Sequence, residues 1–183
     1  MKRIGLLGGS FNPVHLGHVL VATYAASIGR FDEILIMPTY VHVNGKKLID
    51  YEHRVKMCEL AFGYIPNVKV SRIERVLPTP SYTIQTIKYL QETEPASYRL
   101  IVGSDIIENT SSWGDLDTVL KLAPAFVVGR IGYPSKDAEI MMPGISSTDV
   151  RKYLQESRYE KELEASLPFK VLRYIQEHKL YVE

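Results

Sequence analysis

Residues 8–18 read Gly-Gly-Ser-Phe-Asn-Pro-Val-His-Leu-Gly-His, between an apolar run over 4–7 and a helix-compatible run over 19–29. A strand that leads through a glycine turn into a helix gathers main-chain amides around a phosphate group. Gly8 and Gly9 also allow a ligand to approach the backbone closely. The stretch therefore predicts a phosphate-binding loop between the first strand and the first helix.

Two histidines near the end of this stretch have a spacing that lets them bind the same ligand. His15 and His18 lie three residues apart, so both imidazoles project from one face of the first helical turn. Each can donate a hydrogen bond to a phosphate oxygen, and the helix N-terminus adds about 0.3–1 kcal/mol for an anion. Gly17 between them leaves room for a flat or bulky group.

Three other interpretations of the stretch are open. A metal site would need a third ligand, and no Cys, Glu or further His stands nearby in the sequence. The histidine pair could merely cap a helix. A dinucleotide-binding fold would place G-x-G-x-x-G at this turn, a pattern that Gly5, Gly8 and Gly9 do not supply.

Composition indicates one cytoplasmic domain over residues 1–183. With 45% hydrophobic residues the chain can bury one sizeable core, and its net charge of +1 comes without a long block of one sign. We therefore expect neither a nucleic-acid nor a membrane partner. Cys58 has no partner for an internal disulfide, the N-terminal apolar run does not fit a signal peptide, and no apolar run reaches membrane-spanning length.

Apolar runs alternate with helical patterns along the whole chain. The expected strands are Ile4 to Leu7, Glu33 to Met37, Val68 to Val70, Arg99 to Gly103, Ala125 to Val128 and Glu139 to Met142. The expected helices are 19–29, 51–62, 82–92, 113–123 and most of the chain after 146, with a break near Pro168. This alternation predicts an α/β fold: a Rossmann-like, doubly wound parallel sheet of about six strands with helices on both faces.

In such a sheet, ligands bind outside the carboxyl ends of the strands, where the strand order reverses. The notable polar residues all follow strand ends: 10–18 after the first strand, 42–47 after the second, Ser104 and Asp105 after the fourth, and Arg130 after the fifth. We expect them to converge on one site.

A second polar motif covers residues 144–151, Gly-Ile-Ser-Ser-Thr-Asp-Val-Arg. Ser146 or Ser147 suits the N-cap of a helix, and Ser146 with Asp149 has the spacing of a capping box. Arg151, one turn further, could bring a cation to the same helix end. An ordinary capped helix would explain this stretch alone, but its combination with residues 8–18 favours an anion site.

Both motifs together resemble the nucleotidyltransferase superfamily with the H-x-G-H signature. The loop is most similar to its nicotinate/nicotinamide mononucleotide adenylyltransferase branch, and residues 145–151 fit the second signature, I-S-S-T-x-x-R. Glu52-His53-Arg54 with Met57, residues 80–84, residues 103–105 with Trp113, and the tail 171–181 are similar to the bacterial enzymes of this branch. The resemblance covers the whole chain.

The resemblance implies an ATP site and an acceptor site. Predicted to bind ATP are Gly8, Gly9, Ser10, Phe11, His15, His18, Gly103, Asp105, Ile145, Ser146, Ser147, Thr148 and Arg151, with His15, His18 and Arg151 as the catalytic residues. Predicted to bind the acceptor are Asn12, Lys46, Lys47, Thr83, Trp113 and Arg130. Trp113 would stack on the pyridine ring, although a core aromatic is the plain alternative, and Asp105 could instead be a helix N-cap.

The second loop departs from the family pattern. Members often carry Pro-Pro-His-Lys there, whereas residues 41–47 of this chain read Val-His-Val-Asn-Gly-Lys-Lys. Either Lys46 or Lys47 could therefore meet the acceptor phosphate.

The implied reaction transfers the adenylyl group of ATP to nicotinate mononucleotide and yields deamido-NAD and pyrophosphate. Mg²⁺ would be carried by ATP, without a protein metal site. The alternatives are nicotinamide mononucleotide as acceptor, cytidylyl transfer to another phosphorylated acceptor, and a nucleotide-binding module without turnover. Main-chain donors near Thr83 and Trp113 predict at least about tenfold preference for nicotinate mononucleotide, because a carboxylate accepts hydrogen bonds and a carboxamide NH₂ does not.

Overall fold

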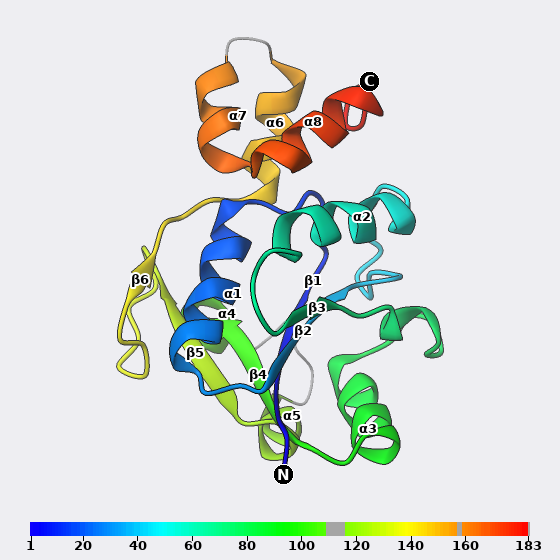
Figure 1. Ribbon diagram of the computed structural model, residues 1–183, viewed down its shortest axis with the longest axis vertical. Helices are drawn as coiled ribbons and strands as arrows, with labels where there is room; N and C mark the ends of the chain where they lie inside the picture. Colours follow the sequence, from blue (N-terminus) through cyan, green and yellow to red (C-terminus); the bar gives the residue numbers. More distant parts are fainter. Residues whose placement is uncertain (109–115, 157–158, 183) are drawn as a thin grey trace.

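The computed structural model describes residues 1–108, 116–156 and 159–182. Its centre is a six-stranded sheet in the order β3-β2-β1-β4-β5-β6, with parallel pairing between all neighbours (Figure 1). The strands are β1 (Arg3–Gly9), β2 (Glu33–Pro38), β3 (Val68–Val70), β4 (Ser97–Gly103), β5 (Ala125–Arg130) and β6 (Met141–Met142). The six predicted strands and their parallel arrangement are confirmed, although β6 is shorter than expected.

The helices follow the predicted order with two differences. They are α1 (Leu16–Ile28), α2 (Tyr51–Phe62), α3 (Thr83–Thr93), α4 (Ser104–Glu108), α5 (Leu116–Leu122), α6 (Ser147–Gln155), α7 (Glu160–Ser166) and α8 (Phe169–Glu177), with a short 3₁₀ turn η1 (Ile73–Arg75). The short helix α4 directly after β4 was not predicted, and α5 begins at Leu116, while Trp113 lies outside the described residues. The break near Pro168 is confirmed, because Pro168 caps α8.

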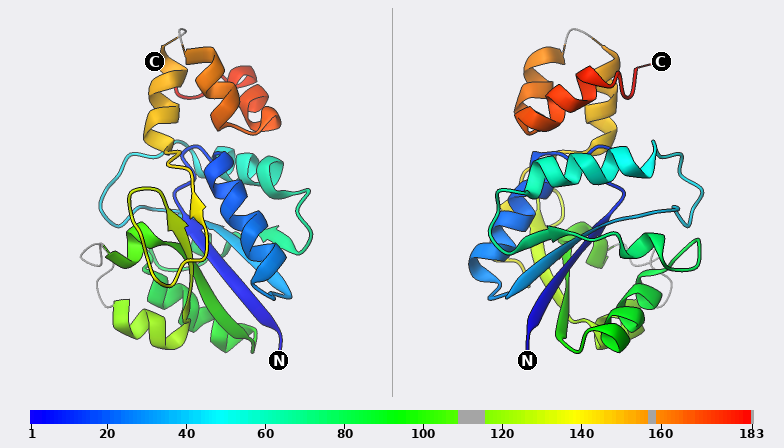
Figure 2. Two further views of the ribbon diagram at one scale, coloured as in Figure 1. Left: turned by 90° about the vertical axis from the view of Figure 1, so that its left-hand side faces the viewer. Right: turned by 45° about the vertical axis from the view of Figure 1, so that its right-hand side comes forward.

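Helices cover both faces of the sheet (Figure 2). On one face, side chains of α1, α2 and α8 such as Val19, Phe62 and Val171 form one apolar core. On the other face, α3 and α5 contribute Ile87 and Val119 to a second core. Every residue of β2 is buried, as expected for a parallel strand with helices on both of its faces.

The strand order reverses next to β1. The chain runs outward from β1 through β2 to β3, then returns to the other side of β1 as β4. Loops that leave β1 and β4 therefore diverge at the carboxyl ends of neighbouring strands, which opens a crevice there.

The C-terminal helices α6, α7 and α8 lie beyond the carboxyl ends of the strands, next to α1 and α2 (Figure 1). Val150 of α6 and Ile175 of α8 belong to the same apolar core as α1 and α2. These helices therefore close one end of the crevice. In the described part of the chain, no helix has the length and apolar character that a bilayer crossing requires.

Candidate active site

The loop after β1 holds the two histidines face to face. His15 is the N-cap of α1, and its main-chain N–H donates to His18 Nδ1 over 3.2 Å. The two imidazole rings stack with their centroids 3.7 Å apart. A Cβ atom at Gly17 would lie 3.0 Å from His15 Nδ1, closer than an ordinary van der Waals contact. The space that Gly17 leaves is therefore filled by the His15 ring.

Both imidazoles are neutral at pH 7. Burial, and then the Arg130 charge, lower the pKa of His15 to about 4. Burial lowers the pKa of His18 well below its usual range, with His15 and Arg130 adding to the effect. Because His18 Nδ1 accepts a hydrogen bond, the proton of the neutral ring resides on Nε2, which can donate to a ligand. His15 Nδ1 is buried without a hydrogen-bond partner in the described part of the chain.

A cavity of about 340 Å³ opens beside these rings. Its lining includes Gly8, His15, Gly17, His18, Lys46, Gly103, Asp105, Arg130, Ile145, Ser146, Ser147 and Thr148. We call it the histidine cavity.

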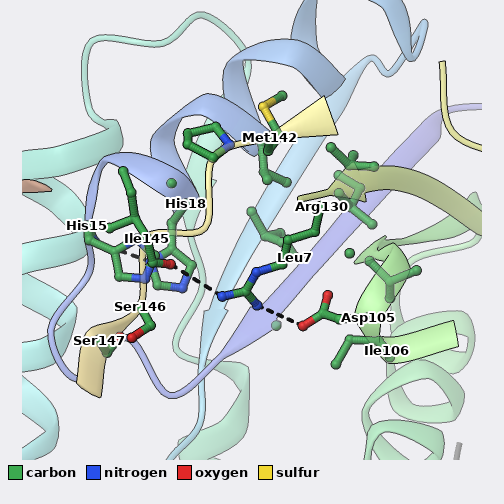
Figure 3. A pocket seen from close by; sticks show the side chains of 18 of the residues that line it. Leu7, His15, His18, Asp105, Ile106, Arg130, Met142, Ile145, Ser146 and Ser147 are labelled. Atoms are coloured by element: carbon green, nitrogen blue, oxygen red, sulfur yellow. Dashed lines mark hydrogen bonds and ion pairs between the residues drawn. The ribbon is translucent and has the colours of Figure 1, made fainter. Parts of the chain in front are cut away.

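Arg130, at the end of β5, crosses the histidine cavity (Figure 3). Its Nη1 donates to Asp105 Oδ2 at 2.7 Å, and its Nη2 to the main-chain oxygen of Ile145 at 3.4 Å. A Cβ atom at Gly103 would overlap with Asp105 Oδ1, so this carboxylate would have to shift if residue 103 carried a side chain. The guanidinium and the two imidazoles therefore face the same space.

The second motif touches the first loop directly. Ser146 caps α6, with its Oγ accepting from the N–H of Asp149 at 3.1 Å. Ser147 Oγ donates to the carbonyl of Pro13 at 2.9 Å, and Arg151 Nη1 donates to the carbonyl of Asn12 at 2.6 Å. Two motifs separated by more than a hundred residues are thus joined by side chain to main chain hydrogen bonds.

A larger cavity of about 690 Å³ lies on the other side of Gly8. Its lining includes Gly8, Gly9, Ser10, Thr39, His42, Glu74, Ser81, Thr83, Ile84, Thr86, Leu100 and Ile106. Gly8, Leu100 and Ile106 border both cavities, so the two adjoin across the end of β1. We call the larger one the α3 cavity, since the start of α3 forms part of its wall.

The structure divides the predicted site residues between the two cavities. Arg130 and Lys46, predicted to bind the acceptor, line the histidine cavity because β5 and the second loop bring them to that side. Gly9 and Ser10, predicted to bind ATP, line the α3 cavity. Thr83, predicted to bind the acceptor, lines the α3 cavity, whereas Trp113 lies outside the described residues.

Four predicted site residues line neither cavity: Phe11, Asn12, Lys47 and Arg151. Phe11 is 1% exposed and packs edge-on against the His18 ring, so it supports the histidine. Asn12 is buried, and its Oδ1 accepts from the N–H of Ile49 and from the hydroxyl of Tyr181. Lys47 is exposed, and Arg151 is held against the first loop.

Arg54 is an organising residue to which the sequence analysis assigned no role. It is 1% exposed and donates to four main-chain carbonyls, those of Ser10, Thr39, Tyr40 and Ile49, at 2.7–3.4 Å. One guanidinium therefore ties the loop after β1 to the loop after β2. The sequence feature that could have indicated this role is the position of Arg54, which shares the apolar face of α2 with Val55 and Cys58.

Comparisons with known proteins agree with this geometry. The family described as Cytidylyltransferase-like matches residues 6–153. A relative from Anaeromyxobacter sp. (strain K), named "Probable nicotinate-nucleotide adenylyltransferase", is 38% identical over 98% of this chain and 97% of its own length. The chain belongs to the nicotinate-nucleotide adenylyltransferases of the cytidylyltransferase-like family.

Further matches also span nearly the whole of this adenylyltransferase chain. The relative of the same name from Enterococcus faecalis (strain ATCC 700802 / V583) is 36% identical over 98% of this chain and 85% of its own length. A solved structure of Plasmodium falciparum nicotinic acid mononucleotide adenylyltransferase complexed with NaAD superposes with a TM-score of 0.85. At 19% identity over 99% of this chain and 98% of that one, the superposition shows a shared fold.

Proposed function

We propose that this adenylyltransferase transfers the adenylyl group of ATP to nicotinate mononucleotide and releases pyrophosphate and deamido-NAD. The observation that carries the proposal is the pair of cavities that adjoin at Gly8. One is lined by paired imidazoles and the start of α6, the other by the start of α3. Two substrates bound in them would meet over the loop after β1, where the family motif lies.

The histidine cavity suits ATP. His18 Nε2 offers a donor, and the start of α6 adds the Thr148 hydroxyl and the unpaired main-chain amides of Ser147 and Thr148. Lys46 brings a positive charge to the same cavity. Its pKa is lowered by loss of solvent and by the nearby Arg151, as expected where cations are gathered to receive an anion.

The chemistry needs alignment more than proton transfer. An oxygen of the acceptor's 5′-phosphate attacks the α-phosphorus of ATP, a new P–O bond forms, and the bond to the bridging oxygen of the β-phosphate breaks. Pyrophosphate leaves with that oxygen. Because the attacking phosphate is already an anion at pH 7, no general base is required, and neutral His18 can donate to the charge that develops.

Mg²⁺ fits this site as a companion of ATP. In the described part of the chain, no three His, Cys, Asp or Glu side chains come together to hold a metal ion. Asp105, the carboxylate of the histidine cavity, is paired with Arg130. We therefore propose that the ion is held by phosphate oxygens and water, and that when bound it neutralises charge on the phosphates. Asp105 could contact one of its waters.

The α3 cavity suits a pyridine mononucleotide with a carboxylate. Thr83 and Ile84 are the first two residues of α3, so their N–H groups have no partner within the helix. Donors at this point match a carboxylate, whereas a carboxamide would place its NH₂ against them at a cost of about 1–3 kcal/mol. The proposal that Trp113 stacks on the ring rests on the sequence alone.

The test is an acceptor panel with pyrophosphate release and dinucleotide formation as readouts. With ATP and Mg²⁺, we expect deamido-NAD from nicotinate mononucleotide, and a kcat/KM at least about tenfold lower for nicotinamide mononucleotide. CTP in place of ATP tests the cytidylyl alternative. Absence of dinucleotide from either mononucleotide would overturn the proposal, and equal kcat/KM values would overturn the acceptor preference.

A further inference from the structure

A buried carboxylate brackets the start of α3. Glu74, in η1, is 8% exposed and lines the α3 cavity. It accepts a hydrogen bond from Ser81 Oγ, and its Oε1 accepts another from Thr86 Oγ1 at 2.6 Å. Each oxygen of the buried carboxyl group therefore has a hydroxyl donor.

The two hydroxyls stand on either side of the first turn of α3. Ser81 precedes the helix start at Thr83, and Thr86 follows it by three residues. Inside this bracket lie the unpaired N–H groups of Thr83 and Ile84. The preceding N–H, that of Tyr82, donates to Gln85 Oε1 at 2.8 Å and is thereby occupied. Glu74 therefore fixes the one segment of α3 that presents free donors at the cavity wall.

We propose that Glu74 is a positioning residue for acceptor selectivity, acting through Ser81 and Thr86. By holding both hydroxyls, it sets the distance and direction of the Thr83 and Ile84 amides relative to the pyridine substituent. The proposal rests on the proposed function, since the substituent is taken to be the carboxylate of nicotinate mononucleotide.

A matched pair of variants tests the tether without altering any charge. Thr86→Val keeps the shape of the side chain and removes its donor, whereas Thr86→Ser keeps the donor. We measure kcat and KM for nicotinate mononucleotide, nicotinamide mononucleotide and ATP. For Thr86→Val we expect a KM for nicotinate mononucleotide about tenfold higher, a preference over the amide that falls toward one, and a KM for ATP within about twofold of wild type. Thr86→Ser should retain the wild-type preference.

A second tether variant and a control on the same helix complete the design. Ser81→Ala removes the other donor and should lower the preference in the same direction, which keeps the test valid if Thr86→Val fails to fold. Thr93→Val is the control, because Thr93 Oγ1 at the far end of α3 donates to the carbonyl of Tyr89 at 2.8 Å. It should leave both acceptor KM values unchanged.

Loss of thermal stability with an unchanged acceptor preference in both tether variants would overturn the proposal, because Glu74 would then be structural only. Wild-type protein that forms no dinucleotide would overturn the proposed function, and the selectivity role with it. Wild-type protein that prefers nicotinate mononucleotide while both variants keep that preference would overturn the role of Glu74 alone.

Discussion

The imidazole of His18 is held in one tautomer by the main chain. The His15 N–H occupies Nδ1, burial keeps the ring neutral, and Nε2–H is left to face the histidine cavity. We predict that His18→Ala lowers kcat by about 10²–10³ with the fold intact, because a preorganised donor to developing charge is lost. His178→Ala, at the exposed end of α8, is the control. Steady-state kinetics and circular dichroism decide, and a variant with more than half of wild-type kcat would contradict the assignment.

The low pKa of His15 links stability to pH. Burial and Arg130 lower this pKa from 6.5 to about 4 in the folded chain. Below pH 6.5 His15 binds a proton in the unfolded chain, whereas in the folded chain it stays neutral down to about pH 4. The free energy of unfolding therefore decreases as the pH falls across this window. The loss amounts to about 3 kcal/mol for His15.

Urea unfolding of wild type and His15→Gln at pH 7, 5.5 and 4 checks this expectation. Carboxylates titrate in both proteins, so their shared effect cancels in the difference between the two unfolding free energies. The unfolding free energy of the wild type minus that of His15→Gln should therefore decrease by about 3 kcal/mol as the pH falls from 7 to 4. Parallel pH curves for the two proteins would show that His15 is protonated normally in the fold.

At the level of elements, α2 acts as an anchor for two loops. Arg54 reaches from α2 to carbonyls on both loops, and Arg54→Met would leave these buried acceptors without donors. We expect an unfolding free energy lower by about 3 kcal/mol, measured by urea denaturation. The control is Arg173→Met, which removes an exposed guanidinium 3.7 Å from Glu177. It should change the unfolding free energy by less than about 0.5 kcal/mol. Equal effects of the two substitutions would refute the anchor.

The periodicity of apolar residues predicted all six strands and most helices, but it missed the short helix α4 and could not assign loop residues to a cavity. Runs such as Glu33 to Met37 are long enough to mark a buried strand, and glycine with proline marked the breaks. Where Arg130 points depends on its contacts with Asp105 and Ile145, and those form only when β5 and α6 are in place. Asn12 was likewise predicted to bind the acceptor, yet its side-chain partners Ile49 and Tyr181 are distant in sequence. Loop position was predictable, and side-chain direction was not.

Across the whole molecule, the C-terminal segment takes part in the first loop. Tyr181 lies after α8, and its hydroxyl donates to Asn12 Oδ1 at 3.0 Å. The main-chain carbonyl of Asn12 accepts a hydrogen bond from Arg151 Nη1. Tyr181→Phe removes one hydrogen bond, and we expect kcat/KM for ATP to fall about three- to tenfold with about 1 kcal/mol of stability lost. Tyr64→Phe, on an exposed ring, is the control. Unchanged ATP kinetics in Tyr181→Phe would show that the tail has no part in the site.

The hydrogen bonds between the first loop and the C-terminal part of the chain can form only late in synthesis. The loop with the paired histidines leaves the ribosome early, but its partners Ser147, Arg151 and Tyr181 follow 134 to 169 residues later. A nascent chain can complete all six strands by Met142 and still lack every one of these contacts. Unfinished copies therefore carry the loop after β1 without the hydrogen bonds from Ser147, Arg151 and Tyr181.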